Sequence, residues 1–168
     1  QTIYVYTGTV DADVTWGFIG DVTRYQLNGD VTVAAGATLT LATGIELQTP
    51  SNHYELFVDG ALIADGVLFS GYYSQILVYS GGQADLSDCQ WPDHYASLYA
   101  YDGAQLDVSG GTFRGSAVAI TFADGSKGTI RDCELAAALL NIYSGDTNLL
   151  GSCLSGQVRI SDALPYLR

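Results

Sequence analysis

Short apolar runs recur along the chain, and most of them end in a turn that contains glycine. The runs are VTVAAG, ELFVDG, ILVYSG, LYAYDG, ITFADG and NIYSG. Apolar residues alternate with others or follow each other briefly, and DG, SGG or GD signals interrupt them, which is typical of β-strands joined by tight turns. The segment ELAAALLNI at 134–142 has partly helical spacing, but its place in the series favours a buried strand and a turn.

The glycines that close these runs are regularly spaced. They are Gly36, Gly60, Gly81, Gly103, Gly125 and Gly145, separated by 24, 21, 22, 22 and 20 residues, with Gly8 as an earlier, less regular member. Five positions after the glycine come Leu41, Leu86, Val108, Ile130 and Leu150. A strand that returns every roughly 21 to 22 residues, with no helix between, indicates a three-sided parallel solenoid with coils about 4.8 Å apart.

The sequence therefore predicts an all-β fold, a right-handed parallel β-helix of about seven coils. The hand follows from the rule for parallel crossover connections. We expect a single domain over 1–168, in which 1–28 form an irregular N-terminal coil and 29–168 form the regular coils.

Residues 29–47, GDVTVAAGATLTLATGIEL, resemble the first regular coil of many secreted bacterial right-handed β-helix proteins, the pectin-lyase-like solenoids. That group includes polysaccharide lyases and hydrolases, adhesins and passenger stalks. The resemblance implies the fold and an extracellular or cell-surface location, but it selects no activity. A chain that begins at Gln1 and contains no Met agrees with a signal peptide removed before Gln1.

Alternation within each strand assigns its side chains to two faces. Residues three and five before the glycine should point inward: Val33, Val31, Val78, Ile76, Ala100, Leu98, Phe122, Ile120, Ile142 and Leu140, with Glu55 as an unexplained exception. Residues two and four before it should point outward: Val58, Leu56, Tyr79, Leu77, Tyr101, Tyr99, Ala123, Thr121, Tyr143 and Asn141. The outward set is unusually apolar and aromatic.

A soluble monomer seldom exposes a large apolar patch, so this face needs an explanation. Either a segment or the packing of the rings on each other covers it, or it is a platform for sugar rings or a protein chain. The preferred hypothesis is a non-catalytic extracellular module for adhesion or carbohydrate contact, resembling the non-catalytic branch of the solenoid group. Its predicted binding residues are Tyr79, Tyr99, Tyr101, Tyr143, Leu56 and Leu77.

Three other functions compete with this one. QTIYVYTG begins directly as a strand and neither terminus has a clear polar cap, so uncapped strand edges could pair end to end and form filaments of a structural subunit. A polysaccharide-active enzyme is third, although the five Arg and single Lys show no common repeat position from which to build a lyase groove. Ice binding is weaker, because Thr32, Thr38, Thr40 and Thr43 cluster in one coil only.

Composition restricts the partners. Hydrophobic residues make up 48% and charged residues 14% of the 168, which excludes a disordered chain. The balance of 18 acidic to 6 basic residues gives a net charge of −12, which repels nucleic acid and anionic membranes. No apolar run approaches the roughly 20 residues that span a bilayer. The expected partner is a glycan, a cell-surface component or another copy of the chain, with no nucleic acid and no membrane insertion.

Candidate chemistry is sparse. Asp85 and Asp107 share one repeat position in adjacent coils, so they could hold Ca²⁺ or share a proton, although solvated surface aspartates are the simpler interpretation. His53 and His94 lie in insertions with no second ligand at metal spacing. We predict no cofactor, no resident metal and no catalytic residue.

The three cysteines follow the repeat, eight positions after a glycine. Cys133 and Cys153 should therefore be inward neighbours in adjacent coils, with Cys89 too remote to join them. Because parallel side-chain directions hold the Cβ atoms further apart than a relaxed disulfide needs, we expect free thiols.

Overall fold

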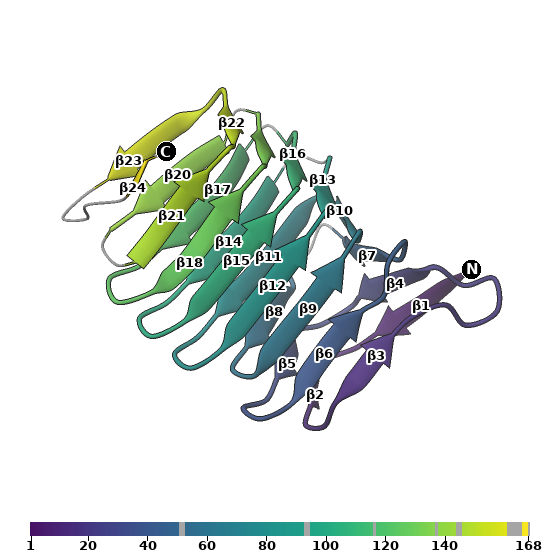
Figure 1. Cartoon of the computed structure of the whole chain (residues 1–168). Coiled ribbons are helices and arrows are strands. Elements are labelled where there is room, and N and C mark those ends of the chain that lie inside the picture. Colours follow the sequence, from purple (N-terminus) through teal and green to yellow (C-terminus); the bar gives the residue numbers. More distant parts are fainter. Residues whose placement is uncertain are drawn as a thin grey trace.

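The chain winds into a solenoid whose three sides are parallel β-sheets (Figure 1). The computed structural model describes residues 1–50, 53–92, 95–115, 117–136, 138–143, 146–160 and 166–167. In this part of the chain each sheet contains eight strands, and successive coils add one strand to each sheet in turn. The predicted all-β, three-sided parallel solenoid of about seven coils is confirmed. None of the described elements is a helix that could cross a bilayer.

Sheet A consists of β1 (Thr2–Val5), β4 (Arg24–Leu27), β7 (Glu46–Thr49), β10 (Leu68–Gly71), β13 (Gln90–Trp91), β16 (Thr112–Phe113), β19 (Glu134–Leu135) and β22 (Cys153–Leu154). Sheet B consists of β2 (Gly8–Val10), β5 (Val31–Val33), β8 (Glu55–Val58), β11 (Tyr73–Val78), β14 (Tyr95–Ala100), β17 (Ala117–Phe122), β20 (Ala138–Ile142) and β23 (Gln157–Ile160). Sheet C consists of β3 (Val14–Trp16), β6 (Thr38–Leu41), β9 (Ala61–Asp65), β12 (Gln83–Ser87), β15 (Gln105–Ser109), β18 (Lys127–Arg131), β21 (Asp146–Leu150) and β24 (Tyr166–Leu167). The segment 134–142 forms β19 and β20, as the strand interpretation predicts.

The interior is filled by columns of side chains from successive coils. In sheet A the rings of Phe69, Trp91 and Phe113 stack with centroids 4.8 and 4.2 Å apart and planes within 6° of parallel. Aliphatic residues from the other two sheets complete the core. All ten residues that alternation places inward, from Val31 to Ile142, are buried. Strand spacing near 4.8 Å suits flat rings, because stacked rings in adjacent coils then touch without moving the backbone.

The turn between β8 and β9 is shorter than the repeat implies, and as a result the inward and outward residues of β8 are the opposite of those predicted. Val58 pairs with Val78 and Ala61 pairs with Gln83, so Asp59 and Gly60 alone span a turn for which the next coil uses residues 79–82. The strand before Gly60 is therefore displaced relative to the glycine. Leu56 is 1% exposed and Val58 is fully buried, and both belong to the core, so their predicted outward positions are wrong. The same shift places Glu55 and Phe57 outward, which explains why Glu55 failed to fit the pattern.

The predicted glycine column is confirmed in its central part. Gly81 donates its N–H to the carbonyl of Gly103 at 3.1 Å, and Gly103 donates to Gly125 at 3.3 Å. All three have φ between 74° and 85°, a left-handed conformation that favours glycine. Gly60 does not belong to this column. Its carbonyl accepts a hydrogen bond from the N–H of Gln83, just as the carbonyl of Gly82 accepts one from Gln105, so Gly60 is the counterpart of Gly82 and not of Gly81. Gly145 lies outside the described residues.

A second change in coil length overturns the prediction for Cys153. Lys127 lies two residues after Gly125 and pairs with Asp146, which lies only one residue after Gly145 in the sequence. Leu149, not Leu150, therefore pairs with Ile130. Cys153 pairs with Glu134 on the outer surface and is exposed, whereas Cys133 is buried. A shift of one residue moves a strand's side chains to the opposite face of the sheet.

The three thiols are free, as expected, but their environments differ. Each buried sulfur lies 3.2 Å from a backbone carbonyl oxygen, Cys89 from Ser87 and Cys133 from Arg131. Burial raises the pKa of the Cys89 thiol to about 12 and also raises the pKa of Cys133. Of the three cysteines only Cys153 is exposed.

In the native protein we expect one thiol to react quickly with a thiol reagent and two to react slowly. Because an exposed sulfur is accessible and a buried thiol resists ionisation, a thiol reagent should label Cys153 quickly. Cys89 and Cys133 should react only after denaturation. Cys153→Ser is the control, and rapid native labelling of that variant would contradict the burial of the other two.

Candidate functional site

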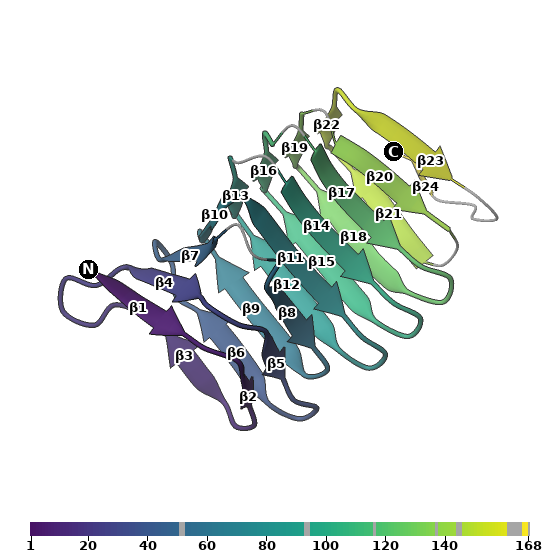
Figure 2. The ribbon, with the colours of Figure 1, turned by 180° about the vertical axis from the view of Figure 1, so that it is seen from behind.

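On the outer face of sheet B, the described residues of four consecutive coils are uncharged. From β11 to β20 the described outward residues are Tyr73, Gln75, Leu77, Tyr79, Tyr95, Ser97, Tyr99, Tyr101, Ala117, Ala119, Thr121, Ala123, Leu139, Asn141 and Tyr143. On sheet C the outward positions of neighbouring coils include Asp85, Asp107 and Lys127. Figure 2 shows β11, β14, β17 and β20 side by side on this face. These described residues differ in this respect from the chain as a whole, which has a net charge of −12.

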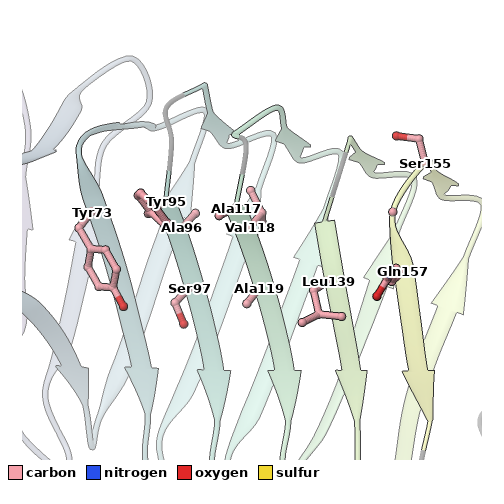
Figure 3. A pocket seen from close by; sticks show the side chains of 11 residues that line it. Tyr73, Tyr95, Ala96, Ser97, Ala117, Val118, Ala119, Leu139, Ser155 and Gln157 are labelled. Atoms are coloured by element: carbon pink, nitrogen blue, oxygen red, sulfur yellow. The ribbon is translucent and has the colours of Figure 1, made fainter.

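An open trough of about 660 Å³ runs along the N-terminal ends of these strands (Figure 3). Its described lining consists of Tyr73, Tyr95, Ala96, Ser97, Ala117, Val118, Ala119, Leu139, Ser155, Gly156 and Gln157. Tyr73 and Tyr95, the trough tyrosines, stand toward one end, with Leu139 and Gln157 toward the other. The trough exists because the outward side chains between these two ends are small: Ser97 on β14, and Ala117 and Ala119 on β17.

The trough is elongated along the solenoid axis. Its lining comes from β11, β14, β17, β20 and the β23 region, which are consecutive neighbours in sheet B. Four strand spacings of about 4.8 Å make it about 19 Å long. The hydroxyl of Ser97 and the amide of Gln157 supply uncharged hydrogen-bonding groups. The described lining contains no carboxylate, imidazole or ammonium group.

Other rings support the trough tyrosines. Tyr95 lies 6.0 Å from Tyr73 and 5.4 Å from Tyr72, measured between ring centroids. His53 meets Tyr73 edge-on at 4.6 Å. Tyr95 remains 40% exposed, so part of its ring surface is accessible. His53 is an exposed loop residue, as predicted, and His94 lies outside the described residues.

The predicted tyrosines form a separate group, which we call the tyrosine band: Tyr79, Tyr99, Tyr101 and Tyr143. All four face outward, at the C-terminal ends of the strands. Tyr79 and Tyr101 stack at 4.7 Å with planes 7° apart, and Tyr99 contacts Tyr101 at 4.4 Å. Three of the rings are half-buried, partly by each other, while Tyr143 is 48% exposed. None of the four lines the trough.

Leu77 faces outward as predicted, although it is only 6% exposed. Its neighbours in register are Phe57 on β8 and Tyr99 on β14, and it lies outside the central core cluster. It therefore belongs to the base of the outer face, where it contributes packing beneath larger rings.

Burial raises the pKa of two tyrosines of the band. Desolvation raises the pKa of Tyr99 and of Tyr101, and neighbouring tyrosines raise it further. Tyr101 also hydrogen-bonds with Tyr79, which favours its protonated form. Tyr99 and Tyr101 therefore stay protonated to a higher pH than an ordinary tyrosine.

The trough itself was missed by the sequence prediction, although the repeat contains its signal. Eight positions before the column glycines come Tyr73, Tyr95 and Ala117, and six positions before come Gln75, Ser97 and Ala119. A fall in side-chain size at one repeat position predicts a hollow between coils. The prediction considered only the four residues nearest the glycine.

The acidic pair is where the repeat places it. Asp85 and Asp107 are register neighbours on the outer face of sheet C, and Gln105 donates an amide hydrogen bond to Asp107 at 2.6 Å. Among the described residues no group of three or more His, Cys, Asp or Glu could hold a metal ion. The pair is thus on a different sheet from the trough.

Comparison with known proteins adds no family to this geometry. No protein-family model, no curated protein and no solved structure matches the chain. Any functional conclusion must therefore come from the residues themselves.

The raised tyrosine pKa values predict a loss of stability at alkaline pH. A folded-state pKa above the unfolded value leaves stability unchanged below the ordinary tyrosine pKa of about 10, and removes it as the pH rises through the folded-state value. The double variant Tyr99→Phe/Tyr101→Phe should lose less stability over that interval than the parent, measured by urea unfolding at neutral and alkaline pH. Tyr4→Phe, on β1, is the matched control. An equal alkaline loss in the double variant and the parent would contradict the assignment.

Proposed function

We propose that this protein is a non-catalytic extracellular module that binds a neutral, extended polysaccharide on the outer face of sheet B. The observation that carries the proposal is the trough: it measures about 660 Å³, it is elongated, and its described lining has no charged group although the protein is acidic. The extracellular location rests on the resemblance of residues 29–47 to secreted solenoids.

The chemistry of the lining favours a sugar chain. Tyrosine presents a broad apolar ring that can stack on the apolar face of a sugar, while its hydroxyl keeps a polar partner. Sites for small organic groups combine apolar walls with a few placed polar groups, and Ser97 and Gln157 have that role here. A neutral ligand covers this face without desolvating a charge, whereas an anionic polymer would be repelled by the net charge of −12.

The length of the trough favours a polymer over a compact ligand. About 19 Å along the axis, crossing five strands of sheet B, accommodates several linked rings in a row. Most glycoside hydrolases cleave with a pair of carboxyl groups that flank the glycosidic bond, and the described lining supplies neither of them. We therefore propose attachment rather than hydrolysis.

Variants of the trough test the proposal. Tyr73→Ala and Tyr95→Ala should each weaken binding to a neutral polysaccharide about tenfold, since tenfold in affinity corresponds to about 1.4 kcal/mol and a ring contact contributes a comparable amount. Ala119→Arg should abolish binding, because it fills the floor with a charged side chain. Calorimetric titration against a panel of neutral and anionic polysaccharides measures the effect.

The control is Tyr4→Ala, which removes a 55% exposed tyrosine from sheet A and should leave the affinity unchanged. Equal affinity of the parent and Ala119→Arg for every polysaccharide that binds would contradict the site. Two results would contradict the ligand class. One is preferential binding of anionic polymers, and the other is a protein that binds the parent but not Ala119→Arg.

A structural, filament-forming role is the second candidate. In the first coil, β1, β2 and β3 are the terminal strands of their sheets, and Ile3, Val5, Val10 and Trp16 are only partly buried. Such strand edges can pair with another copy of the chain. Electron microscopy of the purified protein distinguishes the two roles, because filaments formed through the coil ends should persist in Ala119→Arg.

A further inference from the structure

The tyrosine band and the trough lie on one face but at opposite ends of its strands. Tyr95 of the trough and Tyr101 of the band are six residues apart along the same chain segment, which corresponds to about 20 Å at about 3.3 Å per residue. Between them the outward residues of β14 are Ser97 and Tyr99, neither of which is charged. The two features therefore belong to one continuous surface, whose described residues from β11 to β20 are uncharged.

The band is an ordered surface. The Tyr79–Tyr101 stack and the Tyr99–Tyr101 contact hold three rings in fixed relative positions. Rigid tyrosines offer contact area at small entropic cost. Tyr143 extends the band by two coils beyond Tyr101 and exposes nearly half of its surface.

The two features run parallel to each other. Trough and band each cross β11, β14, β17 and β20, so both follow the solenoid axis. A single chain lying in the trough stays parallel to the band and does not meet it. A second chain lying beside the first would meet it.

Charges bound this surface at its two ends. Glu55 on β8 pairs with Gln75, and Arg159 on β23 pairs with Asn141. The described outward positions between them are uncharged, which favours the same neutral chemistry for an occupant of the band as for the trough.

We propose that the tyrosine band binds a neighbouring chain of the same neutral polysaccharide, so that the protein prefers laterally associated chains to single soluble ones. This inference rests on the proposed function of the trough. When two sites on one rigid face engage one particle, the second contact becomes intramolecular and overall affinity rises with no change at the first site.

The test compares a soluble oligosaccharide with the insoluble form of the same neutral polysaccharide. Tyr143→Ser and Ala123→Arg both alter the band while leaving the core residues Phe122 and Ile142 in place. Each should change the affinity for the soluble form less than twofold and weaken binding to the insoluble form at least tenfold. Tyr143→Phe keeps the ring and should bind the insoluble form like the parent. Tyr4→Ser is the control on another sheet.

The outcomes separate this inference from the proposed function. Suppose that Tyr73→Ala weakens binding to both forms of the polysaccharide, while Tyr143→Ser and Ala123→Arg bind the insoluble form like the parent. The band proposal is then overturned and the trough proposal stands. If the band variants also lose the soluble form, band and trough are one site and the inference is wrong. If Tyr73→Ala, Tyr95→Ala and Ala119→Arg all bind both forms like the parent, the proposed function fails, and the inference that depends on it fails as well.

Discussion

The structure depends on the in-register stacking of its coils. Parallel pairing places each residue about 4.8 Å from its counterpart in the next coil, so every repeat position becomes a column whose members must tolerate direct contact. Inside, the Phe69, Trp91 and Phe113 column satisfies this condition with rings 4.8 and 4.2 Å apart. Outside, Tyr79 and Tyr101 do so at 4.7 Å. The same spacing therefore organises the core and the proposed binding face.

Stacking also explains how a small acidic protein can carry a run of uncharged described residues on the outer face of sheet B, between Glu55 and Arg159. Residues that alternate along a strand belong to separate columns, so the outer columns of sheet B can vary without changing the buried ones beneath them. A column that passes from Tyr73 and Tyr95 to Ala117 opens a trough, while the column through Tyr79 and Tyr101 builds a platform. The proposed recognition of parallel sugar chains follows from columns that themselves run parallel to the solenoid axis.

The repeat in the sequence predicts most of this arrangement, and its errors have one physical cause. Gly81, Gly103 and Gly125 define the register correctly, and the outward positions of Tyr99, Tyr101 and Leu77 follow from it. Leu56 and Cys153 were misplaced because a count along the chain cannot show where a coil is shortened. Only the backbone hydrogen bonds show that the turn at Asp59 and Gly60 is short and that Asp146 pairs with Lys127. The trough requires a comparison of side-chain sizes between columns, which spacing alone does not include.

The most direct test of the register is the removal of one repeat. Asp85 pairs with Asp107 and Leu86 with Val108, so deleting 86–107, a repeat of 22 residues, joins Asp85 to Val108 and keeps every later side chain on its face. Deleting only 86–106 puts Asp107 in the buried place of Leu86 and exchanges the inward and outward faces of the strand. Thermal unfolding followed by circular dichroism should show one cooperative transition for the first deletion, and loss of that transition or a far lower melting temperature for the second. Equal melting temperatures for the two deletions would contradict the account.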